Sequence, residues 1–128
     1  MTHEEANQML EQAFEAAFAE DPKTAERVVN KYKRLKLSSY HMEGKTTGNL
    51  RAVAMERLHA LPVMSAEQKG EVITMMVGSG FGGRNPAVLE VVIQGANVTL
   101  NAWAKEGLIH QNSAKKAVTA AAEALKLD

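Results

Sequence analysis

Apolar residues recur at three- and four-residue steps along the first twenty positions of the chain. They are Ala6, Met9, Leu10, Ala13, Phe14, Ala17 and Phe18. At about 100° per residue these positions share one helical face, and glutamates and glutamines fill the other. Thr2 and Glu5 have the spacing of a capping box, in which each residue satisfies an amide group of the other. The pattern therefore predicts an amphipathic helix over residues 3–20.

The pattern restarts at Asp21-Pro22, where a good N-cap residue precedes a proline suited to the first helical position. An apolar face follows, made of Ala25, Val28, Val29, Tyr32 and Leu35. A basic stripe lies nearly opposite this face and consists of Lys23, Arg27, Lys31 and Arg34. We predict a second helix over residues 22–36. The short connection predicts that the two helices form an antiparallel hairpin.

The rest of the chain also matches helical spacing in several places. Residues 37–48 are predicted to form a loop, and helices are predicted at 49–60, 66–77, 86–106 and 114–126. Gly95 would then mark a kink or a close helix contact. We therefore predict a single all-α domain over residues 1–128, a bundle of five or six amphipathic helices. The valine-rich runs leave one alternative open, an α/β fold with a short strand at 71–77 and a second at 97–100.

Composition narrows the class of protein. The chain has 128 residues, of which 45% are hydrophobic, and it has no cysteine. These values indicate a globular protein and exclude both a disulfide scaffold and a thiolate metal site. The longest apolar runs are too short to span a bilayer, and the first residues lack the basic segment of a secretory signal. We expect a small, soluble, cytoplasmic protein that does not use a membrane as its partner.

The charges are segregated although the net charge is zero. Residues 1–21 hold six acidic residues and no basic one, residues 22–57 hold nine basic and three acidic residues, and the remainder is balanced. Clustered cations of this kind bind acidic proteins or the phosphates of nucleic acid. The candidate binding residues are Lys23, Arg27, Lys31, Lys33, Arg34, Lys36, Lys45 and Arg51.

A glycine-rich stretch supplies a second candidate site. Gly78, Gly80 and Gly83 match G-x-G-x-x-G, a pattern that lets a backbone approach a pyrophosphate at the start of a helix. The acidic residue expected about 20 positions later is missing, so a plain connection between two helices is favoured. Phe81 and Arg84 would be the side chains that such a loop offers to a ligand or a partner.

The remaining residues indicate no reaction. The four histidines are scattered, and no serine lies in the context of a nucleophile. We predict no catalytic residue, no metal and no cofactor. We favour a non-enzymatic regulatory or interaction protein that docks a protein partner through its charged helical faces. The alternatives are a nucleic-acid-binding regulator that uses residues 23–57, with DNA as one ligand, and a nucleotide-binding protein or small enzyme that uses residues 78–84. Formation of a homodimer stays open.

Overall fold

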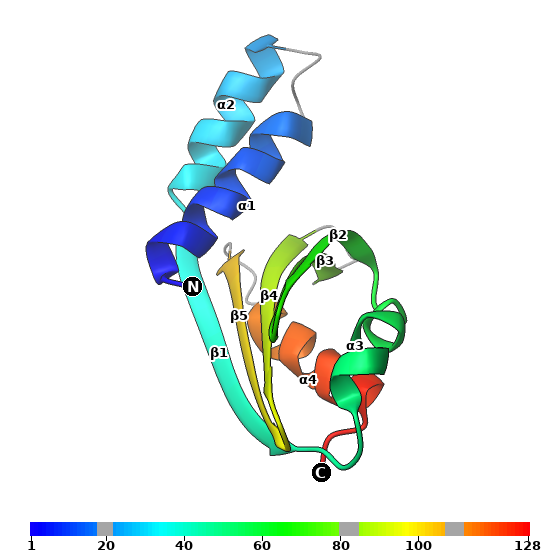
Figure 1. Ribbon diagram of the computed structural model, residues 1–128. Helices are drawn as coiled ribbons and strands as arrows, with labels where there is room; N and C mark the ends of the chain where they lie inside the picture. The colour runs from blue at the N-terminus through cyan, green and yellow to red at the C-terminus, as the bar shows by residue number, and fades with distance from the viewer. Residues whose placement is uncertain (18–21, 80–84, 107–111) are drawn as a thin grey trace.

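The computed structural model describes residues 1–17, 22–79, 85–106 and 112–128, and within them the chain forms four helices and one antiparallel sheet (Figure 1). The helices are α1 (His3–Ala17), α2 (Pro22–Lys33), α3 (Leu50–Leu58) and α4 (Ser113–Leu125). The strands are β1 (Lys36–Lys45), β2 (Val63–Lys69), β3 (Val72–Ser79), β4 (Asn85–Gln94) and β5 (Asn97–Glu106). Their order across the sheet is β1-β5-β4-β3-β2. The fold is therefore α+β.

The four helices lie where local signals placed them. The predicted capping box is present, because the Thr2 amide donates to Glu5 Oε1 at 3.0 Å and the Glu5 amide donates to Thr2 Oγ1 at 3.1 Å. Hydrogen bonds from the backbone and side chain of Thr2 lower the pKa of Glu5. Helix α2 begins at Pro22, although the proposed N-cap Asp21 lies outside the described residues. No described helix combines the length and the apolar character that a bilayer-spanning segment needs.

The all-α prediction is wrong in the centre of the chain. The predicted loop 37–48 is mostly β1, the predicted helix 66–77 is replaced by β2 and β3, and the predicted helix 86–106 is replaced by β4 and β5. Gly70 and Gly95 have φ angles of 60° and 62° and stand at the first positions of two-residue turns between antiparallel strands. Gly95 therefore reverses the chain between two strands and does not kink a helix.

The α/β alternative also differs from the structure. Residues 72–79 and 97–106 are strands, but each pairs antiparallel with its neighbours in a five-stranded sheet. Connections of two residues join β2 to β3 and β4 to β5, whereas parallel strands require a long crossover. The described part of the chain is thus neither a helical bundle nor an α/β protein.

The larger core lies between one face of the sheet and helices α3 and α4 (Figure 1). Alternate positions of the two central strands supply it. They are Ala87, Leu89, Val91 and Ile93 in β4 and Val98, Leu100, Ala102 and Ala104 in β5. The alanines of α4 let this helix lie close to the sheet, and its buried residues include Ala114, Ala117, Val118, Ala121 and Leu125. This side of the molecule is a two-layer structure.

On the opposite face of the sheet, the described residues form a cover at one end. The α1–α2 hairpin rests there and projects beyond the end of the sheet (Figure 1). A smaller core joins the hairpin to the sheet through Ala6, Leu10, Tyr32, Met76, Val88 and Trp103. Trp103 Nε1 donates a hydrogen bond to His3 Nδ1 at 2.8 Å, which fixes the first turn of α1 on β5. The far half of this face carries polar side chains.

Candidate functional site

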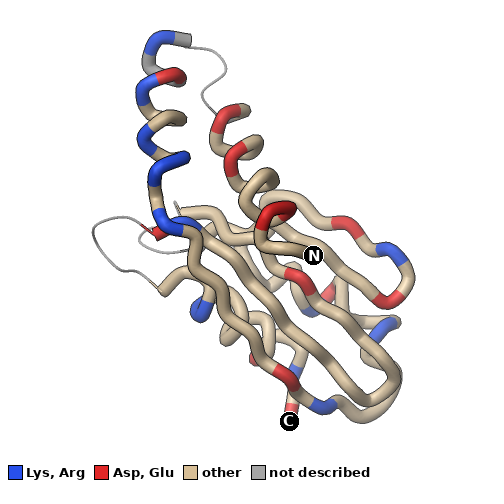
Figure 2. The backbone as a smooth tube through the Cα atoms, turned by 90° about the vertical axis from the view of Figure 1, so that its left-hand side faces the viewer, with Lys and Arg blue, Asp and Glu red and all other residues tan. Residues whose placement is uncertain are grey.

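The basic stripe lies on the outer side of the hairpin. Lys23, Arg27, Lys31 and Lys33 belong to α2, and Arg34 and Lys36 follow directly on the way into β1. Each of these six residues is exposed. Figure 2 shows the basic residues along α2 and the acidic residues along α1, so the two charge blocks of the sequence occupy neighbouring helices. The predicted antiparallel pairing of these helices is present.

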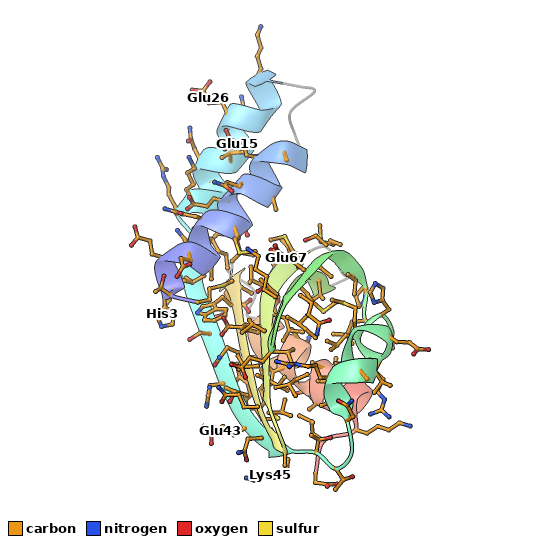
Figure 3. All side chains as sticks on the ribbon, viewed as in Figure 1. His3, Glu15, Glu26, Glu43, Lys45 and Glu67 are labelled. Atoms are coloured by element: carbon orange, nitrogen blue, oxygen red, sulfur yellow. The ribbon has the colours of Figure 1, made fainter. Side chains whose placement is uncertain are left out.

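The six cations are not neutralised by the acidic helix next to them. Within the described ranges, no ion pair within 4 Å joins α1 to α2. Glu15 on α1 and Glu26 on α2 are both exposed, and Figure 3 labels both on the hairpin. Helix α2 therefore presents positive charge to solvent along most of its length, and its last-turn residues Lys31 and Lys33 also suit the negative end of the helix dipole.

Two of the predicted basic residues do not belong to this surface. Lys45 pairs with Asn97 at the end of β1 that is remote from the hairpin, as its label in Figure 3 shows. Lys36 and Lys45 are the first and last residues of the ten-residue strand β1, which places them about 30 Å apart. Arg51 lies near the same end and borders an open depression of about 400 Å³ with Gly48 and Gly95. The basic surface is thus restricted to residues 23–36.

The glycine-rich candidate has a different context from a phosphate-binding loop. Gly78 lies in β3, where it pairs with Pro86 of β4 and donates its amide to the Pro62 carbonyl at 2.9 Å. Residues Gly80, Phe81, Gly83 and Arg84 lie outside the described part of the chain. The segment from residue 85 onward is a strand, so the glycines do not precede the helix N-terminus that a pyrophosphate site uses. Asn85-Pro86 begins a strand and not the predicted helix.

A buried lysine connects the hairpin to the sheet, and sequence patterns did not identify it. Lys105 in β5 is 2% exposed, and its Nζ lies 3.1 Å from Glu11 Oε1 and 3.2 Å from the Lys33 carbonyl oxygen. The same ammonium lies 5.3 Å from the centre of the Tyr32 ring. One side chain of the sheet therefore contacts α1, the last turn of α2 and an aromatic ring of α2. These contacts set the direction in which the basic helix projects.

Tyr32 is the aromatic centre of this junction. Its ring stacks on that of Phe14 with centroids 4.0 Å apart, and the whole residue is 4% exposed. The Tyr32 hydroxyl is buried, and within the described part of the chain it has no hydrogen-bond partner. Burial, and to a lesser extent the Glu11 carboxylate, raises the pKa of Tyr32 far above its usual range, so the hydroxyl stays neutral.

We expect Tyr32→Phe to stabilise the protein by about 1 kcal/mol, because the change removes a desolvated hydroxyl and keeps the ring stack. Chemical denaturation of the two proteins measures the difference directly. Tyr32→Leu serves as the control, since it removes both the hydroxyl and the stack and should be destabilising. A loss of stability in Tyr32→Phe would contradict the absence of a partner for this hydroxyl.

A row of polar side chains crosses the open half of the same sheet face. Glu90 Oε1 accepts from Asn101 Nδ2 at 3.2 Å, and Asn101 Oδ1 lies 2.6 Å from His41 Nδ1. The Asn101 contact, together with the nearby Glu43, raises the pKa of His41. His41 lies in β1 and not in the loop predicted for it. The row runs from the buried Glu90 of β4 through Asn101 of β5 to the exposed His41 of β1 and contains no nucleophile.

The described residues contain no group of three or more His, Asp or Glu residues that could hold a metal ion. The sequence matches no known family model, and it matches none of the curated proteins with which it was compared. The site must therefore be argued from its own geometry. Of the features described above, the exposed basic helix is the largest concentration of unpaired charge of one sign.

Proposed function

We propose that the protein is a non-enzymatic interaction protein that docks an acidic segment of a partner protein along the basic face of α2. The observation that supports this most directly is the exposure of Lys23, Arg27, Lys31 and Arg34 on a projecting helix. These residues extend over about 17 Å, the length of three helical turns. A partner helix or strand with carboxylates on one side matches this length. The proposal includes a cytoplasmic location.

The neighbouring acidic helix favours a protein over nucleic acid as the partner. Glu4, Glu5 and Glu15 are exposed on α1, and the chain has no net charge and a pI of about 6.9. A polyanion as wide as a DNA duplex that lay across the hairpin would bring phosphates toward these carboxylates. Sequence-independent binding of nucleic acid normally uses a surface with a clear excess of positive charge. A narrow acidic segment can follow α2 and avoid α1.

Binding of a labelled glutamate-rich helical peptide tests the proposal. We expect Lys31→Glu combined with Arg34→Glu to weaken this binding at least tenfold, a change of about 1.4 kcal/mol or more, because two attractive contacts become repulsive. Arg51→Glu combined with Lys116→Glu is the matched control, since it makes the same change in net charge at two exposed positions away from α2. Fluorescence anisotropy at low and moderate salt measures all three proteins.

Duplex DNA, measured under the same conditions, separates the two kinds of partner. Tighter binding of DNA than of the peptide, with a steep decrease as salt rises, would contradict the protein-partner proposal and favour the nucleic-acid alternative. Equal losses in the α2 variant and in the control variant would show that only net charge matters. A peptide that binds the wild type no better than either variant would remove the basis for an acidic partner. Affinity purification with and without nuclease then identifies the natural partner.

A further inference from the structure

Among the described residues, strand β1 forms one edge of the sheet, because it pairs with β5 on one side and only its last residue, Lys45, is bonded on the other side, to Asp128. Its register with β5 runs without a shift from Lys36 to Lys45. The strand contains no proline, and Ser38, Tyr40 and Met42 occupy the α4-facing positions in its middle, while its charged residues Lys36, Glu43 and Lys45 are exposed. A long, regular edge of this kind is a template for pairing with a further strand.

The direction of the backbone groups follows from the hydrogen bonds at the end of β1. The Asp128 amide donates to the Lys45 carbonyl at 2.9 Å, whereas the Thr46 amide donates to the Ala96 carbonyl on the β5 side at 2.9 Å. Lys45 thus directs its backbone groups away from β5. Since these directions alternate along an antiparallel strand, the groups of Leu37, Ser39, His41 and Glu43 also point outward. Within the described chain, no hydrogen bond is formed by these outward groups.

The other edge of the sheet is protected in ways that β1 is not. Strand β2 is shorter, follows Pro62, and has a register shift between Val63 and Ser65 in its pairing with β3. Exposed charges do not distinguish the two edges, since β2 carries the pair Glu67 and Lys69 and β1 carries the pair His41 and Glu43. Bulges and prolines are among the usual protections of edge strands against pairing. The contrast between the two edges indicates that β1 is kept available for pairing.

We propose that β1 pairs antiparallel with β1 of a second copy of the chain, about a two-fold axis that passes beside Tyr40. In this register Leu37 faces Glu43 of the second copy and Ser39 faces His41 of the second copy. The four residues with outward groups therefore satisfy one another completely. No two like charges lie directly opposite, and the two Tyr40 residues meet at a close, non-hydrogen-bonded position where aromatic pairs are favourable.

The surface beside β1 fits this arrangement. A depression of about 270 Å³ adjoins the strand and is lined by Ser38, Tyr40, Asn112 and Lys115 among others. The proposed register places Met42 of the second copy opposite Ser38, so that the exposed part of the methionine enters this depression. Lys115 Nζ lies 5.9 Å from the Tyr40 ring centre, which holds the ring at the axis. A single shared strand buries less than a standard interface, so we expect a concentration-dependent dimer of about micromolar affinity.

Variants that carry two lysines or two glutamates at positions 39 and 41 test the proposed register. We expect the wild type to dimerise in analytical ultracentrifugation. Ser39→Lys with His41→Lys should raise the dissociation constant at least about tenfold, and Ser39→Glu with His41→Glu should do the same, because like charges then face each other twice. A mixture of the two double variants should form a heterodimer, since the register places a lysine opposite a glutamate at both positions.

The matched control is Met64→Lys with Gln68→Lys, which adds the same charge at two exposed positions on β2. This variant should dimerise like the wild type, and thermal unfolding should show that every variant is folded. A wild type that remains monomeric at high micromolar concentration would overturn the proposal. So would a dimer that survives both changes in β1, a dimer that is lost in the β2 control, or a mixture of the charge variants that forms no heterodimer.

Discussion

Lys105→Met is expected to release the α1–α2 hairpin from the sheet, with a loss of about 2–3 kcal/mol in the free energy that holds it there. Methionine keeps much of the aliphatic stem but removes the ammonium from Glu11 and from the Lys33 carbonyl. Removing one member of a buried ion pair leaves the other charge without a counter-charge, which typically destabilises a protein by about 3–5 kcal/mol. Glu11 retains 22% exposure and can recover some hydration, which places the expected loss toward the lower end.

Hydrogen exchange resolved along the chain measures this effect. The amides of α1 and α2 should lose protection in Lys105→Met, whereas those of β4, β5 and α4 should keep it, because the larger core holds these three elements together without the hairpin. Glu11→Gln is the control, since it removes the same ion pair and leaves the lysine bonded to the Lys33 carbonyl. It should produce the same pattern to a smaller extent. Uniform loss of protection would contradict the separate attachment of the hairpin.

Leu100→Ala is expected to destabilise the whole molecule by about 3–4 kcal/mol. Leu100 is fully buried at the centre of the core between the sheet and α4. Replacing its isobutyl side chain by a methyl group forfeits burial and leaves a cavity in surroundings that already consist of packed secondary structure. All elements that contact the sheet depend on this core, so protection should fall together in strands and helices.

Global denaturation monitored by circular dichroism tests the second prediction. A single transition at lower denaturant concentration with an unchanged slope is the expected result. Leu100→Ile is a control that conserves volume and should cost less than about 1.5 kcal/mol. If Leu100→Ala affected only the hairpin, or cost less than the isoleucine variant, the assignment of Leu100 to the main core would be wrong.

The helices could be predicted from the sequence because their signals are local. Thr2 and Glu5 form a capping box three residues apart, and α4 is rich in alanine, the strongest helix former. The favoured all-α prediction lacks the strands because both faces of the central strands are partly buried. In β5, Leu100, Ala102 and Ala104 face one core and Trp103 faces the other, so the alternation of apolar and polar residues is obscured.

The candidate site also has a part that the sequence predicts and a part that it does not. The exposed cations of α2 could be found because helical spacing and charge define them without any tertiary contact. Lys45 and Arg51 are close to this block in the sequence but lie at the other end of the sheet, and only strand β1 explains the separation. Lys105 could not be recognised, since the sequence gives no sign that the glutamate 94 positions earlier neutralises it.

Because the sheet has a core on each face, deletions within its strands are expected to disrupt packing on both sides. Deleting a single codon within β5 would shift every following side chain of that strand to the opposite face. Trp103 and Lys105 would then point into the layer of small residues beneath α4, while Ala102 and Ala104 would be left against the hairpin. The turn at Gly95 and Ala96 has only two residues, so it is too short to compensate for such a shift in register. Substitutions on the exposed side of α2 meet no such restriction, so this surface can change while the length of β5 stays fixed.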